Sequence, residues 1–205
     1  MKNIIQNIRR LFFDNSCTCC GEKASDNLIY LCYNCLDKIV RQKSLNKVGD
    51  TYYIWPYKGE FRKLLLEYKN NSRLALGKII SSLIEEEIFK VVYEEDIDYI
   101  VPIPINFRRE QIRGFNQVEE ILKNLNYSFL KTNRVKNTKK MFKILDKEKR
   151  ENNIKNSFKV DKEFKAKNIL IFDDIITTGA TIEEFKRELI KNGEVNKIVV
   201  FSLAE

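Results

Sequence analysis

The sequence contains no histidine among its 205 residues. Because histidine is the usual general base near neutral pH, its absence leaves no obvious residue for that role. It also removes one of the two common ligands of structural zinc, so four cysteine thiolates are the only conventional zinc set that the chain can offer. A catalytic zinc is not expected, since no ligand set for an open site remains.

The sequence also lacks a long apolar run. No segment approaches the roughly 18 apolar residues of a membrane span, so we expect no transmembrane segment. The first fifteen residues do not form a signal-peptide core, because polar and basic side chains interrupt them at Gln6, Asn7, Arg9 and Arg10. They are more typical of a short amphipathic helix. We therefore expect a cytoplasmic protein whose cysteines stay reduced.

The bulk composition is that of a folded protein, with 43% hydrophobic and 32% charged residues. Its length allows one α/β domain and a small appendage. The net charge of +8 would attract a polyanion, such as nucleic acid or a phosphorylated small molecule. The alternative is a solvated lysine-rich surface, because the basic residues are spread along the chain. The densest basic stretch, residues 131–149, is the best candidate for phosphate contacts.

All five cysteines lie near the N-terminus, at Cys17, Cys19, Cys20, Cys32 and Cys35. Cys17 with Cys20 and Cys32 with Cys35 form two C-x2-C pairs, which is the spacing of a zinc ribbon or knuckle. We expect these four residues to hold a closed, structural zinc ion, with the Cys19 side chain pointing away. A ligand set that uses Cys19 in place of Cys20, a redox pair, and an accidental cluster remain the alternatives.

The remaining pattern predicts an α/β domain with a mostly parallel central sheet. Strands are expected within 51–57, 98–105, 168–174 and 197–203, and helices within 60–69, 74–92, 114–125 and 181–193, the last ended by Gly193. Residues 133–162 are the least regular. A polar connector over 38–49 places a domain boundary near Val48, which gives a zinc module over 1–47 and an α/β domain over 48–205.

The most specific feature is the segment 169–182, ILIFDDIITTGATI. An apolar strand ends in Asp173 and Asp174, at the sheet edge where open α/β sheets bind ligands. Residues 177–181 (TTGAT) then enter a helix, where Gly179 allows an unusual backbone conformation and the helix N-terminus favours an anion. Such a cradle beside a diol-binding acid matches a ribose 5-phosphate. The plainer alternative is a strand-to-helix turn in which threonines cap the helix.

This segment resembles the signature of type I phosphoribosyltransferases that binds phosphoribosyl pyrophosphate (PRPP). The chain as a whole resembles the ComF family of competence-associated proteins. That resemblance covers the four cysteines, YKGEFRKLLLEYK at 57–69, DYIVPIPINFRREQIRGFNQ at 98–117 and KRENNIKNSF at 149–158. It implies a type I phosphoribosyltransferase fold with an N-terminal zinc ribbon or knuckle. Two features depart from it: Met141 stands where relatives usually carry glutamine, and residues 71–73 lack a glycine–acid pair.

The resemblance also implies the site residues. The catalytic positions would be Asp173, Asp174, Lys69 and Arg113, with Mg²⁺ bound together with PRPP. Ligand contacts would come from the loop after the strand, from the VPIP segment, from the RGFNQ hallmark and from an R-x-x-N pair; these residues are Thr177, Thr178, Gly179, Ala180, Thr181, Pro102, Ile103, Pro104, Asn116, Gln117, Arg150 and Asn153. For the RGFNQ residues the alternative is a helix N-terminus with solvated charges.

Two functions follow from these patterns. The first is a phosphoribosyl transferase, or a protein that recognises PRPP without turning it over. The second is a non-catalytic component of DNA uptake that grips single-stranded DNA and works with helicase or processing proteins. The basic stretch 131–149, which includes Phe142, favours the second through phosphate contacts and stacking, whereas the intact acid pair favours the first. The acceptor of a transfer reaction cannot be named from the sequence.

Overall fold

The computed structural model describes residues 16–70, 73–136, 153–161 and 163–205. The amphipathic helix expected within 1–15, most of the basic stretch 131–149, and Arg150 lie outside the described residues. Helices cover α2 (Tyr33–Arg41), α3 (Gly59–Asn70), α4 (Leu74–Glu94), α5 (Phe107–Arg113), α6 (Gln117–Asn124) and α8 (Ala180–Lys191). Strands cover β1 (Asn46–Val48), β2 (Thr51–Trp55), β3 (Tyr99–Pro102), β4 (Asn133–Arg134), β5 (Phe158–Lys159), β6 (Phe164–Ile175) and β7 (Gly193–Ala204).

The centre of the protein is a five-stranded sheet with the order β1-β2-β7-β6-β3. Only the edge strand β1 is antiparallel to its neighbour, so the sheet is mostly parallel. β6, α8 and β7 form the βαβ unit expected from the sequence, with Ile169 of β6 opposite Ile198 of β7. The mixed α/β class and the mostly parallel central sheet are therefore confirmed.

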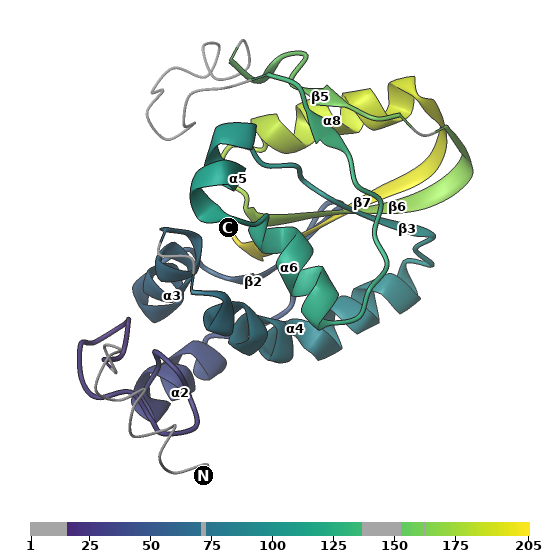
Figure 1. Cartoon of the computed structure of the whole chain (residues 1–205). Coiled ribbons are helices and arrows are strands. Elements are labelled where there is room, and N and C mark those ends of the chain that lie inside the picture. Colours follow the sequence, from purple (N-terminus) through teal and green to yellow (C-terminus); the bar gives the residue numbers. More distant parts are fainter. Residues whose placement is uncertain (1–15, 71–72, 137–152, 162) are drawn as a thin grey trace.

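Helices cover both faces of this sheet (Figure 1). On one face Leu170 and Phe172 of β6 pack in a core with residues of α3, α4 and α6. On the other face Ile169 and Ile171 pack in a second core with residues of α8 and Phe158 of β5. Because side chains alternate along a strand, the two residues that follow on β6 also emerge on opposite faces. The sheet thus separates Asp173 from Asp174.

Several element boundaries differ from the sequence expectation. The helix expected over 114–125 begins only at Gln117, and a separate helix, α5, precedes it. Gly114 adopts the left-handed conformation with φ 82° and ends α5, so the chain turns between the two helices. Gly193 does not end the last helix, which stops at Lys191; it opens β7 instead.

Within the described ranges, no helix is both long enough and apolar enough to cross a membrane.

Candidate ligand site and cysteine cluster

Asp174 is a buried acid whose two carboxylate oxygens are both held. Lys69, from the last turn of α3, places its Nζ 2.8 Å from Oδ1 of Asp174. The amide nitrogen of Gln117, at the start of α6, donates to the other oxygen. Arg113 of α5 donates in turn to the side-chain oxygen of Gln117. Three predicted site residues are therefore connected to a fourth, Asp174: Lys69 directly, and Arg113 through Gln117.

Asp173 lies on the α8 side of the sheet and has a different environment. Its Oδ1 accepts a hydrogen bond of 2.8 Å from the backbone N–H of Asp174. Burial and the neighbouring Asp174 carboxylate raise the pKa of Asp173 to about 7, although Lys69 and Arg134 oppose the rise. Two acids with such different surroundings at one strand end are typical of a functional site rather than of a packing solution.

Two arginines near the acid pair were not predicted from the sequence. The cost of desolvating its guanidinium lowers the pKa of Arg109, on α5, and the attraction of Asp174 opposes that effect. Arg134, on β4, lies over the ring of Phe158 at 5.2 Å, and burial with the nearby charge of Arg109 lowers its pKa to about 10 while Asp173 opposes the change. Both remain cations at neutral pH. Arg109 had a local signal, because it stands four residues before Arg113 on one helix.

Residues 177–181 cover the end of the connection between β6 and α8 and the first two residues of α8. Gly179 stands at the N-cap position of α8 with φ 72°, a left-handed conformation that strongly favours glycine. Because glycine has no side chain, the N-cap residue of α8 makes no side-chain capping hydrogen bond. The alternative interpretation expected threonines to cap this helix, but the N-cap residue is Gly179. The N-terminal turn of α8 follows the acid pair closely in the sequence, and its use as an anion cradle remains a prediction.

The segment 102–105 begins at the last residue of β3, at the same edge of the sheet. Asn116 holds this segment, because its amide nitrogen donates to the Ile103 carbonyl at 3.2 Å. The same amide also donates to Glu119, and its oxygen caps α6 by accepting from the Val118 N–H. Asn116 thus already has partners for its amide groups, and its contact with a ligand remains a prediction. A small cavity of about 110 Å³ adjoins the segment, lined among others by Pro104, Ile105, Asn116 and Arg134.

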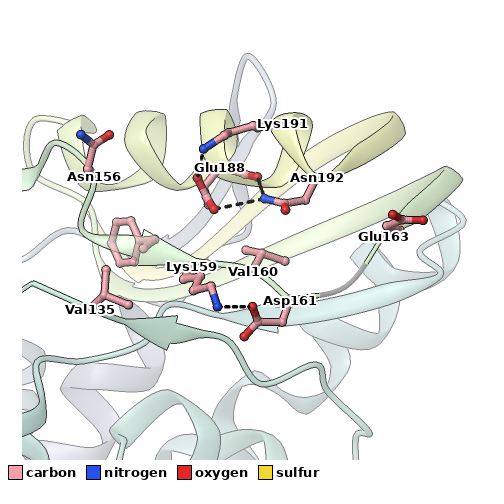
Figure 2. A pocket seen from close by; sticks show the side chains of 10 residues that line it. Val135, Asn156, Lys159, Val160, Asp161, Glu163, Glu188, Lys191 and Asn192 are labelled. Atoms are coloured by element: carbon pink, nitrogen blue, oxygen red, sulfur yellow. Dashed lines mark hydrogen bonds and ion pairs between the residues drawn. The ribbon is translucent and has the colours of Figure 1, made fainter.

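A larger hollow of about 500 Å³ lies elsewhere, between the β4–β5 hairpin and the C-terminal end of α8 (Figure 2). Four of its charged groups form ion pairs with one another: Lys159 with Asp161 at 2.8 Å, and Lys191 with Glu188 at 3.9 Å. None of the sequence-predicted site residues lines it. Size alone therefore does not identify the site. Asn153, the described member of the R-x-x-N pair, precedes β5, and its contact with any ligand is also still a prediction.

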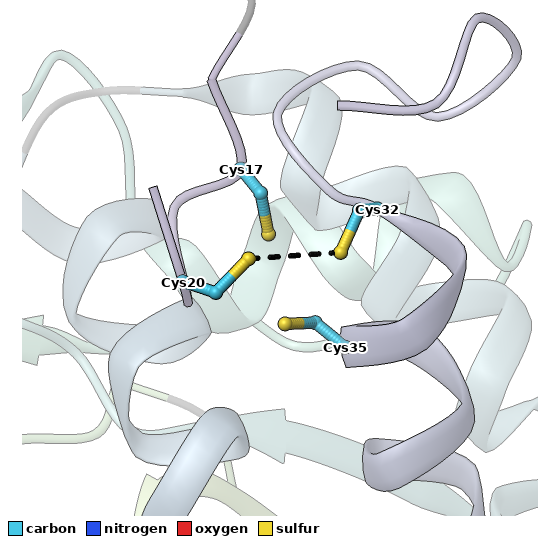
Figure 3. Close-up of side chains that lie close together, drawn as sticks. All are labelled: Cys17, Cys20, Cys32 and Cys35. Atoms are coloured by element: carbon cyan, nitrogen blue, oxygen red, sulfur yellow. Dashed lines mark hydrogen bonds between the residues drawn. The ribbon is translucent and has the colours of Figure 1, made fainter. Parts of the chain in front are cut away.

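Four of the five cysteines converge at the N-terminal end of α2 (Figure 3). The sulfur atoms of Cys17, Cys20, Cys32 and Cys35 all lie within 4.8 Å of one another. The distance between the Cys20 and Cys32 sulfurs is 3.7 Å, which matches the roughly 3.8 Å between thiolates around a tetrahedral zinc with 2.3 Å bonds. The cluster can therefore hold a structural metal ion, and zinc is the ion that this ligand set fits best.

The local backbone explains how the cluster forms. Cys32 is the N-cap of α2 and Cys35 lies in its first turn, so one helical turn places both sulfurs. Burial opposes the ionisation of Cys17, but backbone N–H groups of Cys20, Cys32 and Cys19 outweigh it and lower the pKa of Cys17 to about 6. Such a thiol ionises readily, as a metal ligand must.

Cys19 lies outside the cluster and faces α3. Its thiol donates to the Glu60 carbonyl at 3.4 Å, and its side chain is buried in the same core as α3. Burial raises the pKa of Cys19 to about 11, so it stays a neutral thiol. The ligand set with Cys20 is therefore the one that the geometry favours over the alternative with Cys19.

Comparison with known proteins places these features in a family. No family model matches the sequence. "DNA utilization protein YhgH" of Escherichia coli is 26% identical over 186 residues, which cover 86% of this chain and 78% of that protein. "Competence protein F" of Haemophilus influenzae is 27% identical over 90% of this chain and 83% of its own length. "Competence protein ComFC" of Streptococcus pneumoniae is 30% identical over 73% of this chain and 66% of its own. The chain belongs to the ComF family.

Proposed function

We propose that the chain binds PRPP with Mg²⁺ at the edge of the sheet where β3 and β6 end, and that it works in DNA uptake or utilization. PRPP binding is supported by one observation: an acid pair, a glycine in the left-handed conformation and a helix N-terminus follow one another at the end of β6. The relatives named for competence and DNA utilization support the second part. We further propose that it acts in the cytoplasm with other proteins that process incoming DNA.

In the proposed complex the 5-phosphate lies on the amides of residues 177–181. The ribose hydroxyls face one of the two acids, Asp173 or Asp174, and the pyrophosphate lies near residues 102–105. The cations around the acid pair suit this ligand, because Arg109, Arg113 and Arg134 would meet several negative charges in a partly desolvated site. Lys69 and Gln117 would hold the Asp174 carboxylate in place while the ligand enters.

If the protein is an enzyme, it transfers the phosphoribosyl group with loss of pyrophosphate. Mg²⁺, when bound, would neutralise charge on the leaving pyrophosphate. The protein itself would contribute orientation of the ribose through the acid pair, and positive charge near the leaving group through Arg113 and Lys69. Asp173, whose pKa lies about 7, could exchange a proton near neutral pH. The acceptor is left open.

The decisive experiment compares Gly179→Val with a matched control, Gly49→Val. Both glycines have positive φ, 72° and 60°, and an added Cβ at either would meet no protein atom within 4 Å. Both variants therefore carry similar backbone strain, and blockage of the loop by protein contacts is not the reason for any effect. We expect PRPP with Mg²⁺ to raise the melting temperature of the parent and of Gly49→Val but not that of Gly179→Val. Equal binding by both variants would refute the proposal.

A second experiment tests the two acids. Replacing Asp173 and Asp174 together by asparagine should weaken PRPP and ribose 5-phosphate binding, while binding of inorganic phosphate to the loop should remain. A ligand at 100 times its Kd adds about 2.7 kcal/mol to the free energy of unfolding, so thermal shift resolves these cases. If the variant also loses phosphate binding, the acids maintain the conformation of the loop and do not bind the ribose specifically.

A second candidate function is binding of single-stranded DNA without catalysis. The net charge of +8 and the names of the relatives favour it. The same thermal-shift assay discriminates between the two, with an oligonucleotide in place of PRPP. A stabilising oligonucleotide and an inert PRPP would make the DNA the principal ligand.

The division of the chain into a zinc module over 1–47 and an α/β domain over 48–205 also remains a proposal. β1 spans that boundary at the edge of the central sheet. Zinc is the metal that we propose for the module.

A further inference from the structure

Helix α3 links the cysteine cluster to the acid site. It has 12 residues, which corresponds to a length of about 18 Å at 1.5 Å per residue. One end contacts the knuckle that carries Cys19, and the other end carries Lys69. Its inner face, formed by Phe61, Leu64, Leu65 and Tyr68, is fully buried. A helix with both ends engaged and one face fixed moves as a unit.

The first end is held by three contacts with the cysteine-rich segment. The Cys19 thiol donates to the Glu60 carbonyl at 3.4 Å. Nζ of Lys63 donates to the Cys19 carbonyl at 2.8 Å, so Cys19 and α3 each donate a hydrogen bond to the other. Lys38 of α2 forms an ion pair of 3.5 Å with Glu60. Cys19 itself is only 5% exposed, which makes it part of a packed interface rather than a surface residue.

Aromatic packing extends the same interface. The ring of Trp55 stacks on Phe61 of α3 at 4.0 Å, and its indole N–H donates to the Ile39 carbonyl of α2 at 2.9 Å. The position of α3 is therefore fixed by the segment that carries the cluster as well as by the sheet.

The second end holds the acid network. Lys69 contacts Asp174 directly, at 2.8 Å. Its neighbour Tyr68 donates through its hydroxyl to the Gln117 carbonyl at 2.9 Å, and Gln117 holds the other oxygen of Asp174. Both partners of Asp174 are thus tied to the last turn of α3.

We propose that Cys19 and Lys63 are positioning residues, which dock the cysteine module on α3 and thereby hold Lys69 against Asp174. The cysteine module then does more than stabilise itself. By docking at one end of α3, it fixes the position of Lys69, at the other end, relative to Asp174. The positioning is independent of the ligand, whereas its consequence for PRPP affinity rests on the proposed function.

The test measures the accessibility of Lys69 by acetylation of lysines and mass spectrometry on the full chain. Lys69 and Lys186 are matched, with side chains 14% and 17% exposed and each in an ion pair, but Lys186 pairs with Asp50 away from α3. In Cys19→Ala and in Lys63→Met we expect the acetylation rate of Lys69 to rise about fivefold, the effect of losing one hydrogen bond. The rate at Lys186 should stay unchanged.

Further variants separate positioning from general weakening. Lys63→Arg keeps a donor and should restore the parent rate at Lys69. Lys43→Met removes another partly buried ion pair, the one with Glu87 at 2.8 Å, and should leave Lys69 as in the parent. Zinc content is measured for each variant. If Cys19→Ala loses metal or fails to fold, the result for Lys63→Met tests the proposal, because Lys63 is not one of the four cysteine ligands.

Equal rises at Lys69 and Lys186, or no rise at Lys69 in Lys63→Met, would overturn the proposal. PRPP affinity is measured in parallel. A parent that does not bind PRPP refutes the proposed function and leaves the positioning result standing. A parent that binds PRPP while Lys69 stays protected in the variants refutes the positioning alone.

Discussion

Asp173 should make the protein less stable as the pH rises from about 4 to 7. An ordinary aspartate has a pKa of 3.8, whereas burial and the charge of Asp174 raise that of Asp173 to about 7. Between these values the unfolded chain has lost the proton and the folded chain still binds it. The free energy of unfolding therefore falls across this window, and the full cost is present above pH 7.

The size of the effect follows from the two pKa values. At about 1.4 kcal/mol for each pH unit between them, the upper bound is about 4 kcal/mol. Because Asp173 keeps some contact with solvent and with the cations Lys69 and Arg134, we expect roughly half of that, ~2 kcal/mol. Asp173→Asn, which cannot ionise, should be more stable than the parent at pH 8 by about this amount, with the advantage shrinking toward pH 4.

Urea denaturation at pH 4, 6 and 8 measures this difference. Asp98→Asn is the control, because a backbone hydrogen bond from Asn168 and the ion pair with Lys167 lower the pKa of Asp98. Its stabilising effect is present above its ordinary pKa and is lost as the pH falls, so that variant should be less stable than the parent at pH 8. If Asp173→Asn gains nothing at pH 8 relative to pH 4, the acid is not desolvated and the reasoning fails.

Three further outcomes are expected. Purified reduced protein should contain one zinc per chain by metal analysis, and Cys32→Ser should lose it and loosen the cysteine module, because metal binding and folding are coupled. Lys69→Met should lower the free energy of unfolding in urea by about 3 kcal/mol, since it leaves the buried Asp174 without its cation; a loss below about 1 kcal/mol would mean that Gln117 suffices. Binding of single-stranded DNA, followed by fluorescence anisotropy, should weaken steeply between 50 and 200 mM salt, in the range where phosphate contacts release counterions; salt-independent binding would contradict a phosphate-based mode.

The features that could be predicted from the sequence are local ones. The paired C-x2-C turns place four sulfurs together because each pair is fixed by one tight turn or one helical turn. The spacing did not decide between Cys20 and Cys19 as the second ligand. The strand, acid pair, glycine and helix of segment 169–182 follow one another directly, so their order alone predicts the edge of a sheet with a phosphate loop. Alternation along β6 likewise predicts that Asp173 and Asp174 face opposite sides.

Only the tertiary structure could decide which distant residues meet these features. Lys69 comes from a helix more than 100 positions before Asp174, and Arg134 from a strand between them; neither spacing carries a signal for its partner. Helix α5 was missed because its seven residues bury no side chain and so show no apolar period. The role of Cys19 at α3 was equally hidden. Such contacts depend on how the sheet and its two helical layers close around each other, and that is fixed by packing of the whole core rather than by any one segment.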